Sequence, residues 1–176
     1  MKKVTFLLFS VFIAMTCFEL DAQRSPRIGL SIGNQAPNFE LPMIDGTFLA
    51  LKSLRGKIVL IDFWASWCTA CRNKQSTIAI CHQYQDSRFQ TAEGFVVLSV
   101  SLDKDKSSWL QAIEKDGLIW NTHVIDLKGF SSEVAKLYKL PGIPQNVLLD
   151  GNGIIIARNI RSASLKETLD NMLAND

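Results

Sequence analysis

The sequence predicts a single α/β domain in which buried strands alternate with amphipathic helices. Two apolar, β-branched runs, Ile58–Phe63 and Phe95–Ser101, have the composition and length of strands that are buried on both faces. Helical patterns follow each run, and two more strands near the C-terminus flank a Gly-rich turn at 150–153. With 176 residues and 47% hydrophobic content, the chain can bury one substantial core.

The first 22 residues have the pattern of a secretory signal peptide and not of a folded element. Two lysines follow the initial methionine, and the run 4–18 is almost wholly apolar but short for a membrane span. We expect cleavage after Ala22 and export of the mature chain to the periplasm. Two alternatives stay open, a lipoprotein anchored through Cys17 and a retained signal anchor.

Turn residues and periodicity predict the remaining elements in chain order. Residues 23–32 form a Pro- and Gly-punctuated linker, and the folded domain spans 33–176. Asp45-Gly46 is a hairpin turn whose return strand is 48–51. The other expected elements are a helix from the second cysteine of the C-x-x-C pair to Tyr84, an inserted helix over 103–116, a short strand over 121–125, a helix over 131–137 with Val134, Leu137 and Tyr138 inward, strands over 146–149 and 154–157, and a last helix capped by Ser164.

Charge and histidine content exclude some classes of function. The chain has 19 basic and 17 acidic side chains without a basic run, so we expect no nucleic-acid partner. Its two histidines, His82 and His123, are too few and too scattered for a metal cluster. We expect both to be surface or capping residues.

A Cys-x-x-Cys pair, Cys68 and Cys71, follows the first buried strand after a short turn. The residues after it are helix-compatible, which predicts that the pair lies on the first turn of a helix. Unpaired N–H groups and the helix dipole would favour a thiolate there, and the spacing allows a disulfide. An attacking thiolate with a resolving partner performs dithiol–disulfide exchange. A structural disulfide and half of a zinc site are the alternatives.

The stretch 62–71, Asp-Phe-Trp-Ala-Ser-Trp-Cys-Thr-Ala-Cys, resembles the active site of thioredoxins. Together with Gly-x-x-Ala-Pro-x-Phe at 33–39, it resembles the exported TlpA/ResA-like branch of that superfamily. The resemblance implies a thioredoxin fold, a central mixed sheet flanked by helices. It also implies an N-terminal β-hairpin extension and a helical insertion after the second core strand.

The resemblance also assigns roles to individual residues. Cys68 would be the exposed attacking thiol, and Cys71 the shielded thiol that resolves the mixed disulfide. Trp67, Ile143 and Pro144 would bind substrate, with Pro144 in the cis-proline loop that offers the backbone of its preceding residue to an extended chain. An ordinary turn proline is the alternative for Pro144.

Asp62 is an ionisable residue inside the first buried strand, where alternation places it on one face with Ile58 and Leu60. Burial disfavours the charged form of an unpaired carboxyl group. By resemblance Asp62 is the buried acid that handles the proton of Cys71. We therefore expect Asp62→Asn to slow resolution and to stabilise the fold, and a purely structural acid is the alternative.

Two departures from the family pattern bear on the redox chemistry. Thr69-Ala70 stands where thioredoxins have Gly-Pro, and Lys74 stands where ResA-like proteins often have an acid. These differences leave open whether the protein reduces or oxidises its substrate. Cys81, about 15 Å further along a helix, is too far to bridge either cysteine and is expected to be an ordinary buried thiol.

We expect a thiol-disulfide oxidoreductase, acting as a reductase, whose redox group is the Cys68–Cys71 disulfide and which has no other cofactor and no metal. The expected partners are cysteine-containing substrate proteins and a membrane thiol relay that donates electrons, and the expected state is a monomer. A peroxiredoxin fails on residues, because Ala65 and Ile61 stand where that site needs Thr or Ser and Pro. The alternative is a binding or metal-delivery protein of this fold without turnover.

Overall fold

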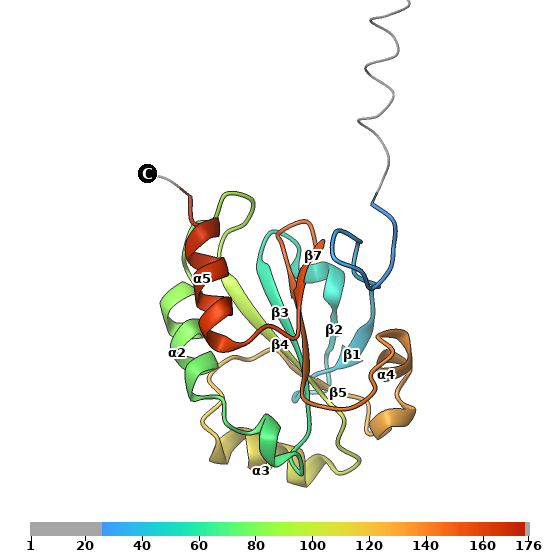
Figure 1. Cartoon of the computed structure of the whole chain (residues 1–176). Coiled ribbons are helices and arrows are strands. Elements are labelled where there is room, and N and C mark those ends of the chain that lie inside the picture. The colour runs from blue at the N-terminus through green and yellow to red at the C-terminus, as the bar shows by residue number, and fades with distance from the viewer. Residues whose placement is uncertain (1–25, 175–176) are drawn as a thin grey trace, which may run out of the picture.

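The computed structural model describes residues 26–174 of the chain. Its elements include seven strands, four α-helices and three short 3₁₀ helices within that range (Figure 1). In order they are β1 (Glu40–Pro42), β2 (Phe48–Ala50), η1 (Leu51–Leu54), β3 (Ile58–Trp64), η2 (Thr69–Cys71), α2 (Gln75–Tyr84), β4 (Phe95–Ser101), α3 (Lys106–Lys115), β5 (His123–Ile125), η3 (Gly129–Ser131), α4 (Glu133–Leu137), β6 (Gln145–Leu149), β7 (Ile155–Arg158) and α5 (Ser162–Met172).

A five-stranded mixed sheet with the order β5-β4-β3-β6-β7 forms the centre of the fold. β3 pairs in parallel with β4 and antiparallel with β6, so it is covered on both edges as well as both faces. All seven of its residues are buried, which explains why Ile58–Trp64 is apolar apart from Asp62. The mixed sheet, the N-terminal β1–β2 hairpin and the helix α3 after the second core strand confirm the predicted thioredoxin fold with its two additions.

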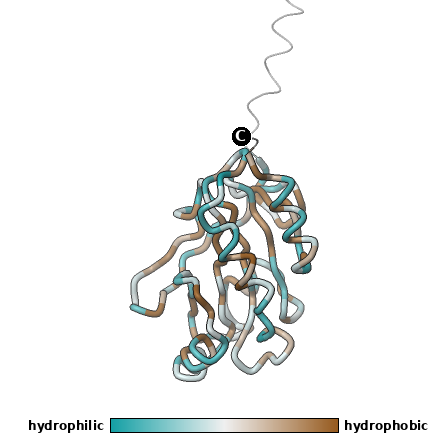
Figure 2. The backbone as a smooth tube through the Cα atoms, turned by 90° about the vertical axis from the view of Figure 1, so that its left-hand side faces the viewer, coloured by the Kyte–Doolittle hydropathy of each residue, from teal (hydrophilic) through white to brown (hydrophobic). Residues whose placement is uncertain are grey.

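Helices and the hairpin cover opposite faces of this sheet. One core cluster joins the sheet to α2, α3 and α5, with Tyr84, Trp109 and Leu169 among its fully buried side chains. The other cluster joins the opposite face to the hairpin, η1 and α4. Figure 1 shows the same division, with α2 and α5 on one side of β3 and with β1, β2 and α4 on the other. In Figure 2 the turns of the helices alternate between hydrophobic and hydrophilic colours, as expected for helices with one face on a core.

Two helix starts follow the capping chemistry of the sequence, and one does not. Asp105 accepts a hydrogen bond from the Ser108 N–H at the start of α3, and Ser132 accepts one from the Val134 N–H at the start of α4. The prediction that Ser164 caps the last helix is wrong. Leu165 already donates its N–H to the carbonyl of Arg161, so Ser164 lies inside the first turn of α5.

Two predictions of burial are also wrong. Leu137 is 41% exposed, because it borders a surface hollow between α4 and the hairpin, whereas Val134 and Tyr138 are buried as expected. His123 was expected at the surface but is 1% exposed at the start of β5. There its ring stacks on Trp120, with the centroids 5.6 Å apart.

The segment before the hairpin is attached to the sheet domain. Gly29 donates its N–H to the carbonyl of Gln35, and the Arg158 guanidinium donates to the carbonyl of Leu30. Residues 27–32, expected to be linker, are therefore tied to the domain. The expected signal peptide 1–22, the lipidation site Cys17 and residues 23–25 lie outside the described residues. Between residues 26 and 174, no helix combines the length and apolar character that crossing a membrane requires.

Candidate active site

The candidate active site is a disulfide that follows the buried strand β3. Cys68 and Cys71 are bonded with an S–S distance of 2.01 Å and a Cα–Cα distance of 5.2 Å. Ala65 accepts a hydrogen bond from the N–H of Cys68, and Cys68 accepts one from the N–H of Cys71, which folds the loop into two successive turns. The redox pair is therefore held at a fixed position just beyond the carboxyl end of the central strand β3.

The structure corrects the predicted helical position of the two cysteines. Thr69–Cys71 is a separate 3₁₀ turn, and α2 begins only at Gln75, after a break in which Lys74 has non-helical dihedral angles. The dipole argument for a thiolate at the start of a long helix thus does not apply to Cys68. Any stabilisation of the thiolate must come from the local turn and from nearby charges.

The two cysteines differ in burial in the predicted direction, although Cys68 is less exposed than expected. Cys68 was expected to be exposed, and with the disulfide closed it is 8% exposed, against 1% for Cys71. The disulfide itself shields both sulfurs, and the turn that contains Cys71 is packed into the core that α2 and α5 share with the sheet. Cys68 is therefore the more exposed residue of the pair, by a small margin.

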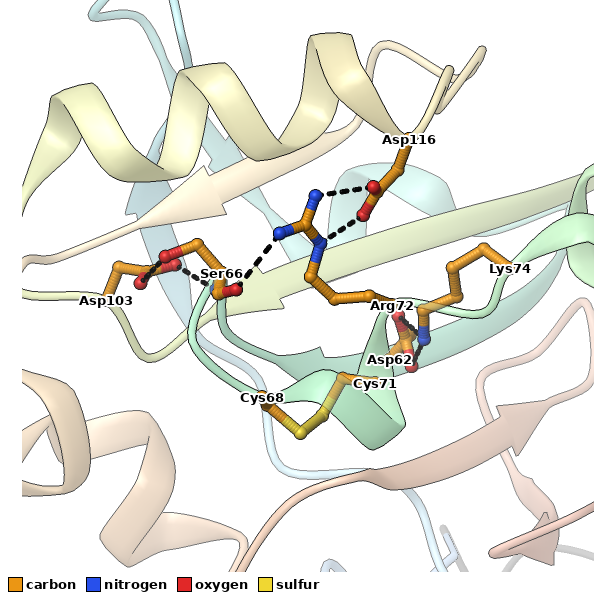
Figure 3. Close-up of a disulfide and its surroundings, with 8 residues drawn as sticks. All are labelled: Asp62, Ser66, Cys68, Cys71, Arg72, Lys74, Asp103 and Asp116. Carbon is orange, nitrogen blue, oxygen red and sulfur yellow. Dashed lines mark hydrogen bonds and ion pairs between the residues drawn. A yellow bond between two sulfur atoms is a disulfide. The ribbon is translucent and has the colours of Figure 1, made fainter.

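Asp62 is buried beside the disulfide, but it is not the isolated acid that the sequence suggested. Both of its carboxylate oxygens accept hydrogen bonds from the Lys74 ammonium at 2.8 Å (Figure 3). The side chains are only 7% and 10% exposed, so this is an ion pair in a nearly water-free site. Lys74 follows Cys71 by only three residues, so the pair lies close to the cysteine turn (Figure 3). The substitution of a family acid by Lys74 was visible in the sequence, but its pairing with Asp62 was not predicted.

A second polar cluster holds the loop between β3 and Cys68. The carboxylate of Asp103 accepts hydrogen bonds from the N–H and the hydroxyl of Ser66, at 2.9 and 2.6 Å. Arg72 makes a two-pronged contact with Asp116 at the end of α3 and donates to the carbonyl of Ser66 (Figure 3). The hydrogen bond to Asp116 raises the pKa of the Arg72 guanidinium. The inserted helix is thus fastened to the active-site loop.

Sequence reasoning missed this cluster because its members are far apart in the chain. Arg72 follows Cys71 directly, and the sequence does not show whether a charged side chain at this position extends into solvent or pairs with an acid. Only the meeting of β3 with β4 and the packing of α3 over the loop bring the four side chains together.

The proline loop lies beside the end of β3. Phe63 is in register with Gln145 on β6, which places Pro144 level with Trp64 at the point where the active-site loop begins. The Ile143–Pro144 peptide bond is cis. Trp67 directly precedes Cys68 and is 59% exposed. The predicted substrate-binding residues are therefore grouped around the disulfide.

The remaining cysteine of the described chain, Cys81, is a free thiol buried on α2. Burial raises its pKa, so it stays protonated and unreactive at neutral pH. The expectation of an ordinary buried thiol is confirmed. Within residues 26–174, no three His, Cys, Asp or Glu side chains come together in a group that could hold a metal ion.

A reversible disulfide at the end of a central strand, beside a cis-proline loop, defines a class of protein: thioredoxin-fold exchangers of dithiols and disulfides. Residues 32–158 match the AhpC/TSA family. The chain belongs to this family, and within it to the thiol-disulfide oxidoreductases of the TlpA/ResA type, as the resemblance had implied.

Individual relatives agree with this assignment. The thiol-disulfide oxidoreductase ResA of Bacillus thuringiensis is 26% identical over 145 residues, which cover 82% of this chain and 78% of that protein. A thiol-disulfide oxidoreductase from Bacteroides fragilis has a TM-score of 0.68 and 35% identity, covering 78% of this chain and 98% of its own. The thioredoxin domain of a thiol-disulfide oxidoreductase from Bacteroides vulgatus has a TM-score of 0.72 and 29% identity, covering 83% and 100%.

Proposed function

We propose that this oxidoreductase is a protein-disulfide reductase of the cell envelope. The observation that carries the proposal is the Cys68–Cys71 disulfide that follows β3, in which Cys68 is slightly more exposed than Cys71. Two thiols in this arrangement can pass two electrons to a substrate disulfide and recover them from a donor.

The reaction follows from the order of burial. The Cys68 thiolate attacks one sulfur of a substrate disulfide, forming a mixed disulfide and releasing the other substrate sulfur as a thiolate that takes up a proton. Cys71 then loses its proton and attacks the Sγ of Cys68. The second substrate thiol leaves, and the Cys68–Cys71 disulfide closes. The substrate gains two electrons from the enzyme and two protons, one that Cys71 has lost and one from solvent.

Asp62 is the proposed acceptor of the Cys71 proton. Its carboxylate is the acidic group beside Cys71 in Figure 3, and the Lys74 ammonium holds it in place through both oxygens. These two hydrogen bonds fix the direction in which the carboxylate points. Lys74 is thus a positioning residue, and it acts on Cys71 through Asp62.

Trp67, Ile143 and Pro144 form the proposed surface for the substrate chain. Ile143 is half-buried against both core clusters, so the loop is fixed while the backbone at its tip can meet an extended segment. A segment aligned in this way presents its cysteine sulfur to Cys68. Because backbone contacts carry little sequence information, this part of the surface accepts many substrates.

The proposed partners are cysteine-containing proteins as substrates and a membrane thiol relay as the electron donor. The proposed export to the periplasm rests on the leader pattern of residues 1–22, with anchoring through Cys17 as the alternative. The proposed state of the exported protein is a monomer. The protein uses no cofactor beyond its own disulfide. A net charge of +2 gives no electrostatic reason for a nucleic-acid partner.

Catalytic reduction of insulin by the protein with dithiothreitol as donor tests this function against binding or metal delivery without turnover. We expect turnover that Cys68→Ser abolishes, and no turnover by the unsubstituted chain would overturn the proposal. The reduction potential of the Cys68–Cys71 couple then tests the direction. A reduction potential of about −270 mV is expected for a reductase, whereas one of about −120 mV would identify an oxidant.

A further inference from the structure

Two large apolar side chains are exposed side by side next to the disulfide. Trp67 and Phe130 are 59% and 46% exposed, and their ring centroids lie 6.5 Å apart with an angle of 50° between the ring planes. Trp67 belongs to the active-site loop, and Phe130 to η3, which the chain reaches only after β5. An exposed aromatic pair is costly in water and is typical of surfaces that bind another molecule.

The pair borders a hollow of about 520 Å³. Its other walls come from the segment after β4 and from the start of α3, with Leu102, Lys104, Asp105 and Ser108 among its lining residues. Leu102 is 1% exposed and closes the hollow toward the core. The hollow therefore has aromatic side chains at its mouth and an aliphatic side chain at its base.

Both carboxylates that line the hollow are already engaged by serines, and the buried one, Asp103, accepts hydrogen bonds from Ser66 and Ser101. Asp105 already accepts hydrogen bonds from the N–H and hydroxyl of Ser108, both at 2.7 Å. The aliphatic part of Lys104 lies over Gly129, where an added Cβ would meet its Cε at 2.9 Å. Thus Gly129 leaves room for the lysine stem, and the exposed Lys104 and Asp105 bring one charge of each sign to the lining of the hollow.

We propose that this hollow binds a large apolar side chain, aromatic or branched aliphatic, that flanks the target cysteine of the substrate protein. The inference rests on the proposed function and names the class of substrate segment that the site prefers. Trp67 and Cys68 are neighbours in the chain, with Cα atoms about 3.8 Å apart. The residues that flank a substrate cysteine bound at Cys68 are therefore within reach of Trp67 and of the hollow that it lines.

The size and polarity of the hollow favour this occupant over others. An aromatic side chain buries about 150–250 Å² when it is enclosed, and it can pack edge-to-face against both exposed rings. A small polar side chain would leave the two aromatic rings in water, and the two carboxylates that line the hollow already accept hydrogen bonds from serine hydroxyls. The hollow thus adds a preference for a large apolar side chain to the backbone contacts of the proline loop, which do not select for sequence.

Two disulfide-linked peptides that differ only in the residue next to cysteine, Trp in one and Ser in the other, test the proposal. The readout is the ratio of kcat/KM for their reduction by the reduced full-length chain. We expect a preference of about tenfold for the Trp peptide, the low end of what one apolar contact supplies. Phe130→Ala should lower the ratio to about twofold or less, and Phe130→Leu should retain part of it.

Phe48→Ala is the matched control, because Phe48 is 66% exposed on the hairpin and has no part in the site. It should leave the ratio unchanged. Equal rates for the two peptides, or a preference that survives Phe130→Ala, would overturn the inference while leaving the reductase intact. A dimer that Phe130→Ala converts to a monomer, without any peptide preference, would instead identify a second copy as the occupant and would also overturn it. Failure to reduce either peptide would overturn the proposed function itself.

Discussion

Asp62 and Lys74 neutralise one another at a position where each alone would be a buried, unpaired charge. If Asp62 were an isolated buried acid, as the sequence suggested, its substitution by a neutral amide would raise the free energy of unfolding. The ion pair reverses that expectation, because Asp62→Asn leaves the Lys74 ammonium without its counterion. We expect the substitution to lower the free energy of unfolding of the oxidised protein by about 3 kcal/mol, measured by urea denaturation.

The double variant Asp62→Asn with Lys74→Met is the control, and it should regain most of that loss because it removes both charges. The single substitution should also slow resolution of the mixed disulfide by about a hundredfold, while initial attack by Cys68 changes little. Stopped-flow measurement with a peptide disulfide separates the two steps. An unchanged resolution rate between pH 6 and 9 would make Asp62 a structural residue only.

At the scale of elements, the contact between Arg72 and Asp116 joins the inserted helix α3 to the active-site loop. Lysine has no planar fork of donors, so it cannot reproduce the two hydrogen bonds at 2.5 and 2.6 Å. We expect Arg72→Lys to destabilise the protein by about 1–2 kcal/mol. It should also speed amide hydrogen exchange in residues 106–116, which mass spectrometry can measure.

Glu133→Gln is the comparison for that result, because it breaks an ion pair whose side chains are 78% and 59% exposed. Exposed pairs of this kind contribute about 0–1 kcal/mol, so the variant should be close to the unsubstituted protein. Equal effects of the two substitutions would show that the Arg72–Asp116 contact has no special role in holding α3.

The elements that the sequence predicted well are those whose signal is local. β3 and β4 are mostly apolar runs, and the Asp and Gly residues at 150–153 indicate a turn. The break between η2 and α2 was missed because Arg72, Asn73 and Lys74 are all compatible with a helix. The two cations of this segment are paired with Asp116 and Asp62, contacts that the local sequence does not contain.

Stability of the whole molecule should depend on pH through His123. Burial lowers the pKa of this histidine to about 4, against smaller raising contributions from the backbone of Trp120 and Leu118, and neither ring nitrogen has a hydrogen-bond partner of normal geometry. The unfolded chain binds the proton at its ordinary pKa of 6.5, so acidification favours unfolding. Stability is complete above pH 6.5 and is lost as the pH falls toward 4, by up to about 3 kcal/mol.

Urea denaturation at pH values from 7 to 4 measures this loss. His123→Phe keeps a ring to stack on Trp120 and should flatten the dependence in that window, whereas substitution of the exposed His82 by Asn should not. Carboxylates with lowered pKa, such as Asp105 and Asp170, add losses only below their ordinary value of 3.8. A slope that persists in His123→Phe would show that another group governs acid unfolding.

For the whole molecule, the cysteine motif, the hairpin turns and the strand pattern were enough to predict the thioredoxin fold and to group the disulfide with the proline loop. The charged partners could not be predicted in the same way. Asp62 with Lys74 and Arg72 with Asp116 depend on how α2 and α3 pack against the sheet. His123 was misplaced for the same reason, because nothing around it in the sequence shows that β5 is covered.

Trapping of the mixed disulfide tests the central claim, that Cys68 attacks and Cys71 resolves, most directly. Reduced Cys71→Ser protein is mixed with a peptide disulfide, quenched with acid and analysed by peptide-mapping mass spectrometry. We predict that the peptide accumulates on Cys68, since no resolving thiol remains, and that Cys68→Ser protein captures it far more slowly. Equal capture by the two variants, or an adduct on Cys81 in place of Cys68, would contradict the assignment of the attacking and resolving thiols.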